Sequence, residues 1–300
     1  MTLISENWGE LLEPTLRKVY FDHYNQLAQE SRIPTLFNVG SSSKAAEHDL
    51  GVGAFSAWGE YKGTIEYDDN SKGFETIYTH KQFARGVSAE RKLIDDDMYG
   101  VIQRRTEGLA YGAYLKREQD GASMYNNAFS SAVTGADGVE LCGAHPASPS
   151  NPTTQSNAGS TALSYDAVVA TQLLMRGFKN DRGDLAPSHG NLLVVPPALQ
   201  EEAWTITDTI GKPGTANHDG NYVQSQGMST VVWDYLTDTN NWFLIDSRLL
   251  KMYVNWFDRV PMEFENDKTG DYNLINNYRG YMRYSFGWSD WRWVYGHEVA

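Results

Sequence analysis

The stretch that decides the fold is NYRGYMRYSFGWSDWRWVYG, residues 277–296. Along its first half large apolar side chains alternate with polar ones, which is typical of a strand with one buried face. The apolar positions are Tyr278, Met282, Tyr284, Phe286 and Trp288, and the polar ones are Arg279, Arg283, Ser285 and Ser289. Aromatic residues favour strands that have a broad apolar surface to lie on. The sequence therefore predicts that the chain ends by returning into a sheet begun by earlier residues.

After Gly287 the alternation resumes with Trp291, Trp293 and Tyr295. This pattern indicates either a second strand or a bent continuation of the first, because glycine often marks a break in a strand. An exposed aromatic band could instead stack on sugars or bases. The regular alternation favours a buried sheet.

Composition limits the class of protein. The chain has 300 residues, of which 41% are hydrophobic and 13% aromatic, enough for one large or two modest domains with a real core. A mean hydropathy of -0.51 and the lack of a long apolar run predict no membrane partner, and the N-terminus does not resemble a signal peptide, so we expect a cytoplasmic product. The single Cys142 excludes an internal disulfide. A net charge of -13 argues against tight, non-specific binding to nucleic acid, and an acidic surface would leave nearby DNA mobile.

The first fifty residues predict a helix followed by an extended arm. Pro14 suits the first turn of a helix, and Leu16 and Tyr20 are among apolar residues at helical spacing that continue towards Pro34. Residues 39–53 are small, polar and glycine-rich, so we expect an arm that contacts something else.

A long hairpin is predicted over 55–89. Its strands are WGEYKGTIEY, residues 58–67, and FETIYTHKQFARGV, residues 74–87, joined by a turn over 68–73. Isolated hairpins are marginally stable, so its apolar side chains need cover from the hairpin's own domain or from a neighbouring molecule. The sequence leaves both options open.

The clearest helix is predicted over 89–118, where apolar residues follow a 3.6-residue period. Asp95, Asp96 and Asp97 fall in its first turns, where negative charge favours the helix dipole, so we interpret them as capping and not as a metal site. Gly108 and Gly112 lower the stability of the helix and indicate close approach of another backbone.

The second half of the chain predicts an α/β unit after a long surface loop over 135–162, which is rich in Gly, Pro, Ser, Thr and Asn. We expect helices over 164–178 and 197–210. We expect strands from Gly190, over 229–233 and over 240–246, and then a closing hairpin with its turn at 267–271.

No catalytic residue, cofactor or metal site is predicted. The sequence lacks the hydrolase, metalloprotease, P-loop and dinucleotide motifs, and its seven histidines share no spacing. Asn217, Asp219 and Asn221 resemble the start of a calcium loop without its final glutamate, so a polar turn is favoured. Cys142 and His145 are only half of a zinc site.

The order of these elements resembles the tailed-phage major capsid proteins of the Hong Kong 97 fold, including the head subunits of Mu-like phages. The resemblance rests on six segments. They are the hairpin over 58–85, the helix over 90–117, the loop ending in CGAHPASP, the strand and helix LLVVPPALQEEAW, the NNWFLID strand and the closing NYRGYMRYSFGWSDWRWV. No one of them is diagnostic, whereas their order and spacing together are specific.

The resemblance implies an α+β fold with named parts. It assigns residues 1–53 to an N-arm, 54–89 to an E-loop hairpin, and 160–259 to an α/β A-domain. Residues 90–159, with the spine helix, and 260–300, with the returning strands of an antiparallel sheet, would form the P-domain.

The resemblance also implies the function. Such subunits form pentamers and hexamers, close into an icosahedral shell around double-stranded DNA, and lay each E-loop over a neighbouring subunit. The contact residues implied on the E-loop are Tyr61, Lys62, Ile65, Glu66, Tyr67, Asp68, Asp69, Lys72, Phe74, Ile77 and Tyr78. The protein would then be non-enzymatic and would reside in the virion after assembly in the host cytoplasm.

Further partners implied by the resemblance are a separate scaffolding protein, a portal protein and packaged DNA bound without sequence specificity, and a decoration protein is left open. Lys62, Lys72 and Lys81 could serve the cross-links that some members form, but nothing singles one out and none is predicted. An encapsulin-like compartment is the nearest alternative. A monomeric glycan-binding or hydrolytic protein with an aromatic cleft is the alternative from another class.

Overall fold

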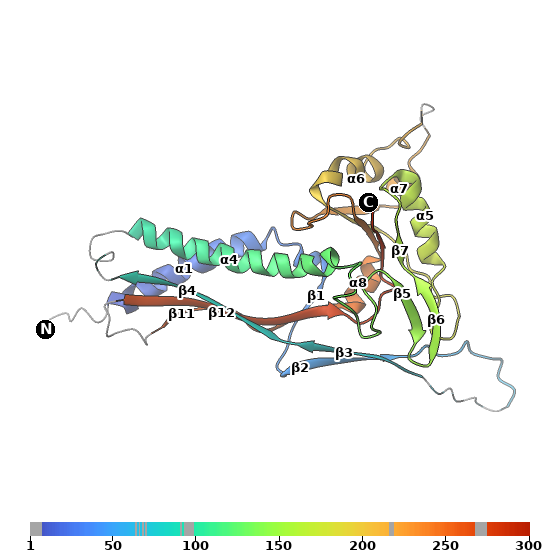
Figure 1. Cartoon of the computed structure of the whole chain (residues 1–300), viewed down its shortest axis with the longest axis horizontal. Coiled ribbons are helices and arrows are strands. Elements are labelled where there is room, and N and C mark those ends of the chain that lie inside the picture. Colours follow the sequence, from blue (N-terminus) through green and yellow to red (C-terminus); the bar gives the residue numbers. More distant parts are fainter. Residues whose placement is uncertain are drawn as a thin grey trace.

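The computed structural model describes residues 8–63, 65, 67, 69, 71–90, 92, 99–215, 219–267 and 275–300. It has an elongated part, where two long helices lie along a sheet, and a compact part, where short helices surround a second sheet (Figure 1). A two-stranded ribbon continues from the elongated sheet beneath the compact part and ends in a long loop (Figure 1).

The elongated part is built on a four-stranded sheet in the order β1-β11-β12-β4. The strands are β1 (Asn38–Ser41), β11 (Val254–Asp267), β12 (Ile275–Trp288) and β4 (Lys81–Glu90). β1 is parallel to β11, and the other pairs are antiparallel. Helices α1 (Trp8–Ala28) and α4 (Tyr99–Asn126) cover one face. Tyr20 and Leu109 from these helices pack in one cluster with Phe264 and Tyr278 from the sheet.

Strand β12 lies between β11 and β4 and follows the predicted alternation except at Ser285, which is buried, and Phe286, which is only partly buried. Tyr278, Met282, Tyr284 and Trp288 are buried, and Arg279 is exposed. The predicted return of the C-terminal segment into an earlier sheet is therefore confirmed.

The compact part is built on a five-stranded sheet in the order β7-β13-β10-β8-β9. The strands are β7 (Ala158–Gly159), β13 (Val294–His297), β10 (Trp242–Ile245), β8 (Leu192–Val195) and β9 (Ser229–Val232). Every residue of β8 and β10 is apolar and buried, as expected of short strands covered on both faces. The surrounding helices are α5 (Tyr165–Arg176), the 3-10 helix η2 (Pro197–Leu199), α6 (Gln200–Thr207), α7 (Tyr222–Ser225) and α8 (Ser247–Tyr253).

Two small antiparallel ribbons and a short helix complete the described elements. One ribbon pairs β2 (Ala46–Val52) with β3 (Lys72–Thr79), and the other pairs β5 (Ala144–Ser148) with β6 (Asn151–Ser156). The short helix is α2 (Ile33–Leu36). None of the described helices has the length and apolar composition needed to cross a membrane.

One buried carboxylate joins the N-terminal segment, α4 and the compact part. Glu118 is 1% exposed, and its Oε2 accepts a hydrogen bond from the indole Nε1 of Trp233 at 2.8 Å. Its Oε1 accepts from the Ser31 hydroxyl, and the Arg32 backbone N–H donates to Oε2 at 3.4 Å. Hydrogen bonds to a charged group are stronger than neutral ones, so this cluster fixes how the three segments meet.

Several sequence expectations are confirmed. The predicted helices over 164–178 and 197–210 correspond to α5 and to η2 with α6, and the predicted strands correspond to β8, β9 and β10. The residues after Gly287 form a separate strand, β13, which leaves the sheet of β12 and enters the five-stranded sheet of the compact part. This destination differs from the expectation that 260–300 returns to one sheet, because Trp293 and Val294 are buried among residues of β8 and β10.

Other expectations are wrong. Residues 58–67 form no strand where they are described; β3 pairs instead with β2, inside the stretch expected to be an arm. The loop over 135–162 contains β5, β6 and β7, because Cys142, His145 and Asn157 are buried.

The predicted helix over 89–118 is also misplaced. β4 continues to Glu90, and α4 begins at Tyr99 and ends at Asn126. Asp95, Asp96 and Asp97 lie outside the described residues. The close approach expected at Gly108 and Gly112 does not occur among the described residues, because a Cβ built on either glycine meets none of their atoms within 4 Å.

Replacing Glu118 with alanine tests the joint between the segments. Glu118→Ala leaves the buried indole N–H of Trp233 without its acceptor, so we expect the free energy of unfolding to fall by about 2–3 kcal/mol. Urea unfolding followed by tryptophan fluorescence measures the change. The neighbouring Gln119→Ala, at an exposed position, is the control and should change stability by less than about 0.5 kcal/mol. Equal effects of the two substitutions would contradict the assigned role.

Candidate subunit interface

The loop over 53–71 exposes the largest apolar side chains of the described chain to solvent. Trp58 is 99% exposed and Tyr67 is 90% exposed. Phe55, Tyr61 and Ile65 are also exposed. Several large exposed apolar side chains on one loop are typical of an interaction site. The loop is therefore the first candidate for an interface.

The ribbon of β2 and β3 is close-packed where it meets the loop over 53–71. A Cβ built on Gly73 of β3 would lie 2.6 Å from the backbone of Gly51 in β2, so only glycine fits there. The pairing shifts by a residue between Leu50 and Val52, which forms a bulge at the same place. Bulges bend and twist a ribbon, so these residues set the direction in which the loop leaves it.

Both roots of the loop are bound to the segment between α5 and β8. Asp181 accepts hydrogen bonds from the Ala54 backbone N–H and from the Ser71 hydroxyl, both at 2.9 Å. Burial alone raises the pKa of Asp181, but these hydrogen bonds outweigh it and hold the pKa below its usual value. The guanidinium of Arg182 donates to the carbonyls of Ala54, at 2.6 Å, and Asp69, at 3.2 Å. The compact part thus holds the two ends of the loop together.

A buried histidine lies where the ribbon joins the four-stranded sheet. His80, between β3 and β4, has Nδ1 at 2.9 Å from the Ser285 hydroxyl and Nε2 at 3.2 Å from the Ser42 hydroxyl. Ser42 in turn donates to Glu47 of β2 at 2.7 Å. Burial lowers the pKa of His80, and the positive charge of Arg283 lowers it further. The ring is neutral at pH 7 and bridges the ribbon and the sheet.

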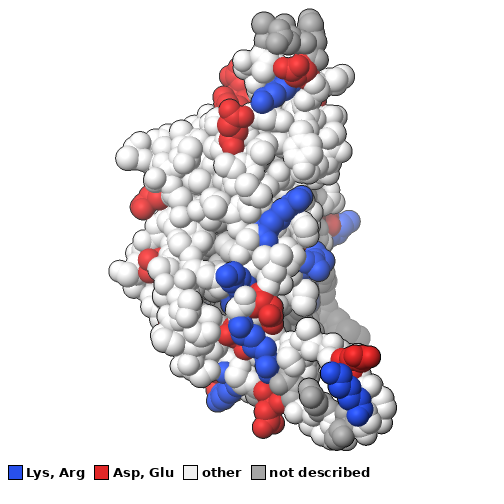
Figure 2. All heavy atoms as spheres, turned by 90° about the vertical axis from the view of Figure 1, so that its right-hand side faces the viewer, with Lys and Arg blue, Asp and Glu red and all other residues white. Residues whose placement is uncertain are grey.

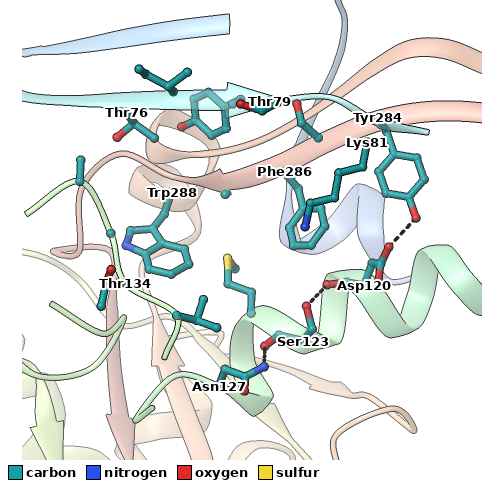
Figure 3. A pocket seen from close by; sticks show the side chains of 18 of the residues that line it. Thr76, Thr79, Lys81, Asp120, Ser123, Asn127, Thr134, Tyr284, Phe286 and Trp288 are labelled. Atoms are coloured by element: carbon teal, nitrogen blue, oxygen red, sulfur yellow. Dashed lines mark hydrogen bonds between the residues drawn. The ribbon is translucent and has the colours of Figure 1, made fainter. Parts of the chain in front are cut away.

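A cavity of about 650 Å³ lies beneath β3, between the ribbon and the end of α4 (Figure 3). Phe286 and Trp288 form its apolar wall. Its polar residues bond to one another: Tyr284 donates to a carboxylate oxygen of Asp120 at 2.7 Å, and the Ser123 hydroxyl donates to the Asp120 carbonyl at 2.6 Å. The contacts of Tyr284, Asp120 and Ser123 are structural, whereas the buried Thr76 hydroxyl in the same cavity has no hydrogen-bond partner in the described part of the chain.

Several large apolar side chains of the compact part are also exposed. They are Leu173 and Leu174 on α5, Trp204 on α6, and Leu185, Ile210 and Tyr222, with Leu173 73% and Ile210 84% exposed. Sequence analysis missed these residues. The available signal was the pair of leucines on α5, which lie outside the buried stripe of that helix.

The contact residues expected on the E-loop fall into two groups. Tyr61, Lys62, Ile65, Tyr67 and Asp69 are exposed on the loop. On β3, Lys72 and Ile77 are exposed, Phe74 is half-buried, and Tyr78 is 3% exposed. The Tyr78 ring packs edge-on against Phe257 at 5.3 Å, so it anchors the ribbon to its own subunit. Glu66 and Asp68 lie outside the described residues.

The residues considered for metal binding have structural contacts. His145 is buried, with Nδ1 2.6 Å from Asp137 and its ring stacked on Trp291. Burial raises the pKa of the Cys142 thiol. Asn221 caps α7 through the Gln224 backbone N–H at 3.0 Å, and Asn217 lies outside the described residues. Within the described part of the chain, no three His, Cys, Asp or Glu residues are grouped to hold a metal ion.

Comparison with known proteins identifies the family. Residues 73–296 match the sequence model of a family described as phage capsid protein. The chain belongs to this family. The match covers three quarters of this capsid subunit and includes α4 and every strand of the four-stranded sheet except β1. No curated protein matches the sequence significantly.

Three solved capsids show the same fold at low sequence identity. The procapsid of bacteriophage JBD30 is 17% identical, with a TM-score of 0.52 over 95% of this chain and 74% of that chain. The capsid of cyanophage P-SCSP1u is 15% identical, with a TM-score of 0.54 over 89% of this chain and 87% of that chain. The mature capsid of bacteriophage PhiM1 is 9% identical, with a TM-score of 0.55 over 89% of this chain and 86% of that chain. These matches confirm the predicted α+β capsid fold of the Hong Kong 97 type.

The face of the capsid subunit drawn in Figure 2 suits contact with other protein. A broad uncharged area lies in its upper half, and below it, towards the loop, Lys and Arg are interspersed with Asp and Glu. Each exposed ion pair contributes only about 0–1 kcal/mol, so the uncharged area is the more important part of this face for binding.

The bridge made by His80 predicts a pH dependence. Because the folded pKa of His80 is lowered, its stabilising contribution is complete above the ordinary histidine pKa of about 6.5 and is lost as the pH falls below it. His80→Asn keeps a polar side chain that does not titrate. We expect the melting temperature of the wild type to fall by roughly 2–4 °C more than that of the variant between pH 7.5 and 5.

A comparison of the two proteins isolates His80 from the other buried histidines, His145 and His297, because both are present in the wild type and in the variant. Burial lowers the pKa of His297 to about 4, and this effect cancels between the two proteins. Identical pH profiles of wild type and variant would show that the bridge does not depend on the neutral ring.

Proposed function

We propose that this capsid protein is the major shell subunit of a tailed bacteriophage and assembles as pentamers and hexamers into an icosahedral shell around double-stranded DNA. The observation that carries the proposal is the loop over 53–71, whose aromatic side chains are mostly exposed in the described part of the subunit. The JBD30 procapsid, which has this fold, was solved with I4 symmetry. In the proposed shell each loop lies over a neighbouring subunit.

The proposed subdivision follows the same family. Residues 1–53 would be the N-arm, 54–89 the E-loop, 90–159 with 260–300 the P-domain and 160–259 the A-domain. Two strand pairings support a change to these boundaries. β2 pairs with β3 and so belongs with the E-loop ribbon, and β13 pairs with β10 and so belongs with the A-domain sheet.

The energetics favour a closed assembly over a simple pair. Burying one large apolar side chain contributes about 1.5–3 kcal/mol. Bringing two proteins together costs an estimated 4–15 kcal/mol before any contact counts. Two or three aromatic residues of one loop therefore only about balance that cost. Closed symmetry repeats the contact at every subunit, so the shell is stable although each interface is modest.

The negative net charge of the subunit is compatible with a shell that encloses DNA. A net charge of -13 repels DNA weakly and leaves it mobile inside a shell. We propose that the partners are further copies of the chain, a scaffolding protein during assembly in the host cytoplasm, a portal protein and DNA held without sequence specificity. Lys62 and Lys72 lie on the exposed loop and ribbon, and no feature of either supports a cross-link between subunits. Whether a decoration protein also binds the shell is left open.

An encapsulin-like compartment is the nearest alternative because its shell would use the same fold. Nuclease-protected double-stranded DNA in particles from infected cells would support the phage shell, whereas particles filled only with protein would support the compartment.

Removing the exposed aromatic side chains of the loop tests the assembly. We expect the purified wild type to form capsomers or megadalton shells in light scattering and electron microscopy. The double variant Trp58→Ser with Tyr67→Ser should stay monomeric, because its loop offers little apolar area to a neighbour, and its melting temperature should be about that of the wild type, since both side chains are exposed.

Met252→Ser, at an exposed residue on α8, is the control and should assemble normally. A wild-type chain that stays monomeric at high concentration would contradict the proposed shell. That result would favour a monomeric binding protein.

A further inference from the structure

The cavity beneath β3 has the size of a small-molecule site. Its volume of about 650 Å³ lies within the range of roughly 300–1,000 Å³ that is usual for ligand pockets. It is lined by β3, the start of β4, the end of α4, the loop over 133–136 and the last residues of β12. A ligand in this cavity would therefore contact the ribbon and the body of the subunit at the same time.

The cavity follows from the topology of the four-stranded sheet. β4 pairs with β12 only as far as Lys81, opposite Tyr284, whereas β12 continues to Trp288. Among the described strands, residues 285–288 of β12 pair with β11 and with no strand on the other side. The space is thus a gap at the edge of the sheet, where β3 has left the plane of β4.

One wall of the cavity is aromatic. Phe286 and Trp288 form it, and Met124 of α4 also lines the cavity. Phe286 is stacked on Trp256, with the two ring centres 5.1 Å apart, so its position is fixed from behind. Such a wall favours a flat apolar ring, since a good aromatic pair contributes about 0.5–1.5 kcal/mol beyond the burial of its area.

Several hydrogen-bond donors around the cavity have no acceptor in the described part of the chain. The Thr76 hydroxyl is buried and unpartnered. The indole Nε1 of Trp288 and the ammonium group of Lys81 make no hydrogen bond or ion pair with described residues. Gly135 leaves the indole N–H uncovered, because a Cβ at this position would lie 2.9 Å from Nε1.

These donors lie on two sides of the cavity. In Figure 3 Thr76 and Trp288 lie on one side, and the Lys81 side chain extends into the cavity on the other, beside Phe286. A ligand that satisfies both sides needs an acceptor at each end of its ring.

The acidic groups around the cavity are already paired. Asp120 forms an ion pair with Lys116 at 2.7 Å. Glu75 lies 3.0 Å from the imidazole Nδ1 of His48, on the other strand of the ribbon. Lys81 therefore has no counter-ion among the described residues, and the end of the ligand that meets it should be negatively charged.

We propose that this cavity is a binding site for a small aromatic carboxylate. The ring lies against Phe286 and Trp288, the carboxylate pairs with Lys81, and a neutral acceptor at the opposite end bonds to the Trp288 indole and the Thr76 hydroxyl. All of these residues belong to one subunit, so the site does not depend on the proposed shell.

Titration calorimetry of the purified wild type with 6-hydroxy-2-naphthoate tests the site. We expect saturable binding of one molecule per subunit. The uncharged 6-hydroxy-2-naphthamide should bind at least about fivefold more weakly, because it brings no charge to Lys81. Equal binding of acid and amide, or no saturable binding of the acid, would overturn the proposal.

Two substitutions test the two ends of the ligand. Lys81→Met should weaken binding of the acid by about fivefold and leave binding of the amide unchanged. Lys72→Met removes an exposed ammonium group of the same ribbon outside the cavity, and this matched control should bind the acid as the wild type does. Equal losses from the two lysine substitutions would contradict the assigned contact.

Thr76→Val keeps the shape of the side chain and removes an unpartnered buried hydroxyl, so the subunit should be at least as stable as the wild type. It should weaken 6-hydroxy-2-naphthoate by about threefold and leave 2-naphthoate, which lacks the second acceptor, unchanged. Equal effects on the two acids would show that Thr76 does not contact the ligand.

Hydrogen exchange locates the bound probe, because the exposed aromatic residues of the loop could also bind an aromatic acid. We expect slower exchange over 75–79 and 133–136, which line the cavity. The double variant Trp58→Ser with Tyr67→Ser should bind the probe as the wild type does. Loss of binding in that variant, or slower exchange confined to 53–71, would place the probe on the loop and contradict the proposal.

Discussion

The central position of β12 is the constraint on which the rest of this subunit depends. β12 pairs with β11 and β4 over most of its length, yet it comes from the last tenth of the chain. β4, about two hundred residues earlier, has no partner in the four-stranded sheet until β12 arrives. Pairings between such distant segments are slow to form, so the elongated part completes its core late in folding.

Around that strand the subunit is joined by a small number of polar contacts. Arg117 of α4 binds both carboxylate oxygens of Asp258 in β11, at 2.8 and 3.1 Å, and lies over the ring of Trp256. Glu118, the next residue, faces the other way and holds Trp233. Buried ion pairs contribute little net stability, but they select one arrangement because a misplaced partner leaves a charge unpaired. α4 thus fixes the angle between the elongated and compact parts.

The ribbon of β2 and β3 extends from this rigid body with little cover of its own. Its root is fixed at three places, by Tyr78 against Phe257, by His80 between Ser42 and Ser285, and by Asp181 at the start of the loop. Between these anchors and the tip, the aromatic side chains stay in solvent. A subunit with a firmly held root and an uncovered tip is suited to repeated contact with copies of itself.

The sequence by itself determined what depends on local pattern. The alternation along 278–288 and the apolar runs that became β8 and β10 identified buried strands, because side-chain period and burial are linked within a few residues. The order of these elements pointed to the capsid fold, and the interface on 54–89 came from that resemblance, since the aromatic content of the segment left its cover open. Only the tertiary structure decided the partners: β3 pairs with β2 and not with 58–67, β13 crosses to the second sheet, and Gly108 and Gly112 face open space among the described residues. Strand pairing and open space depend on which distant segments meet, and that information is absent from the period of any one segment.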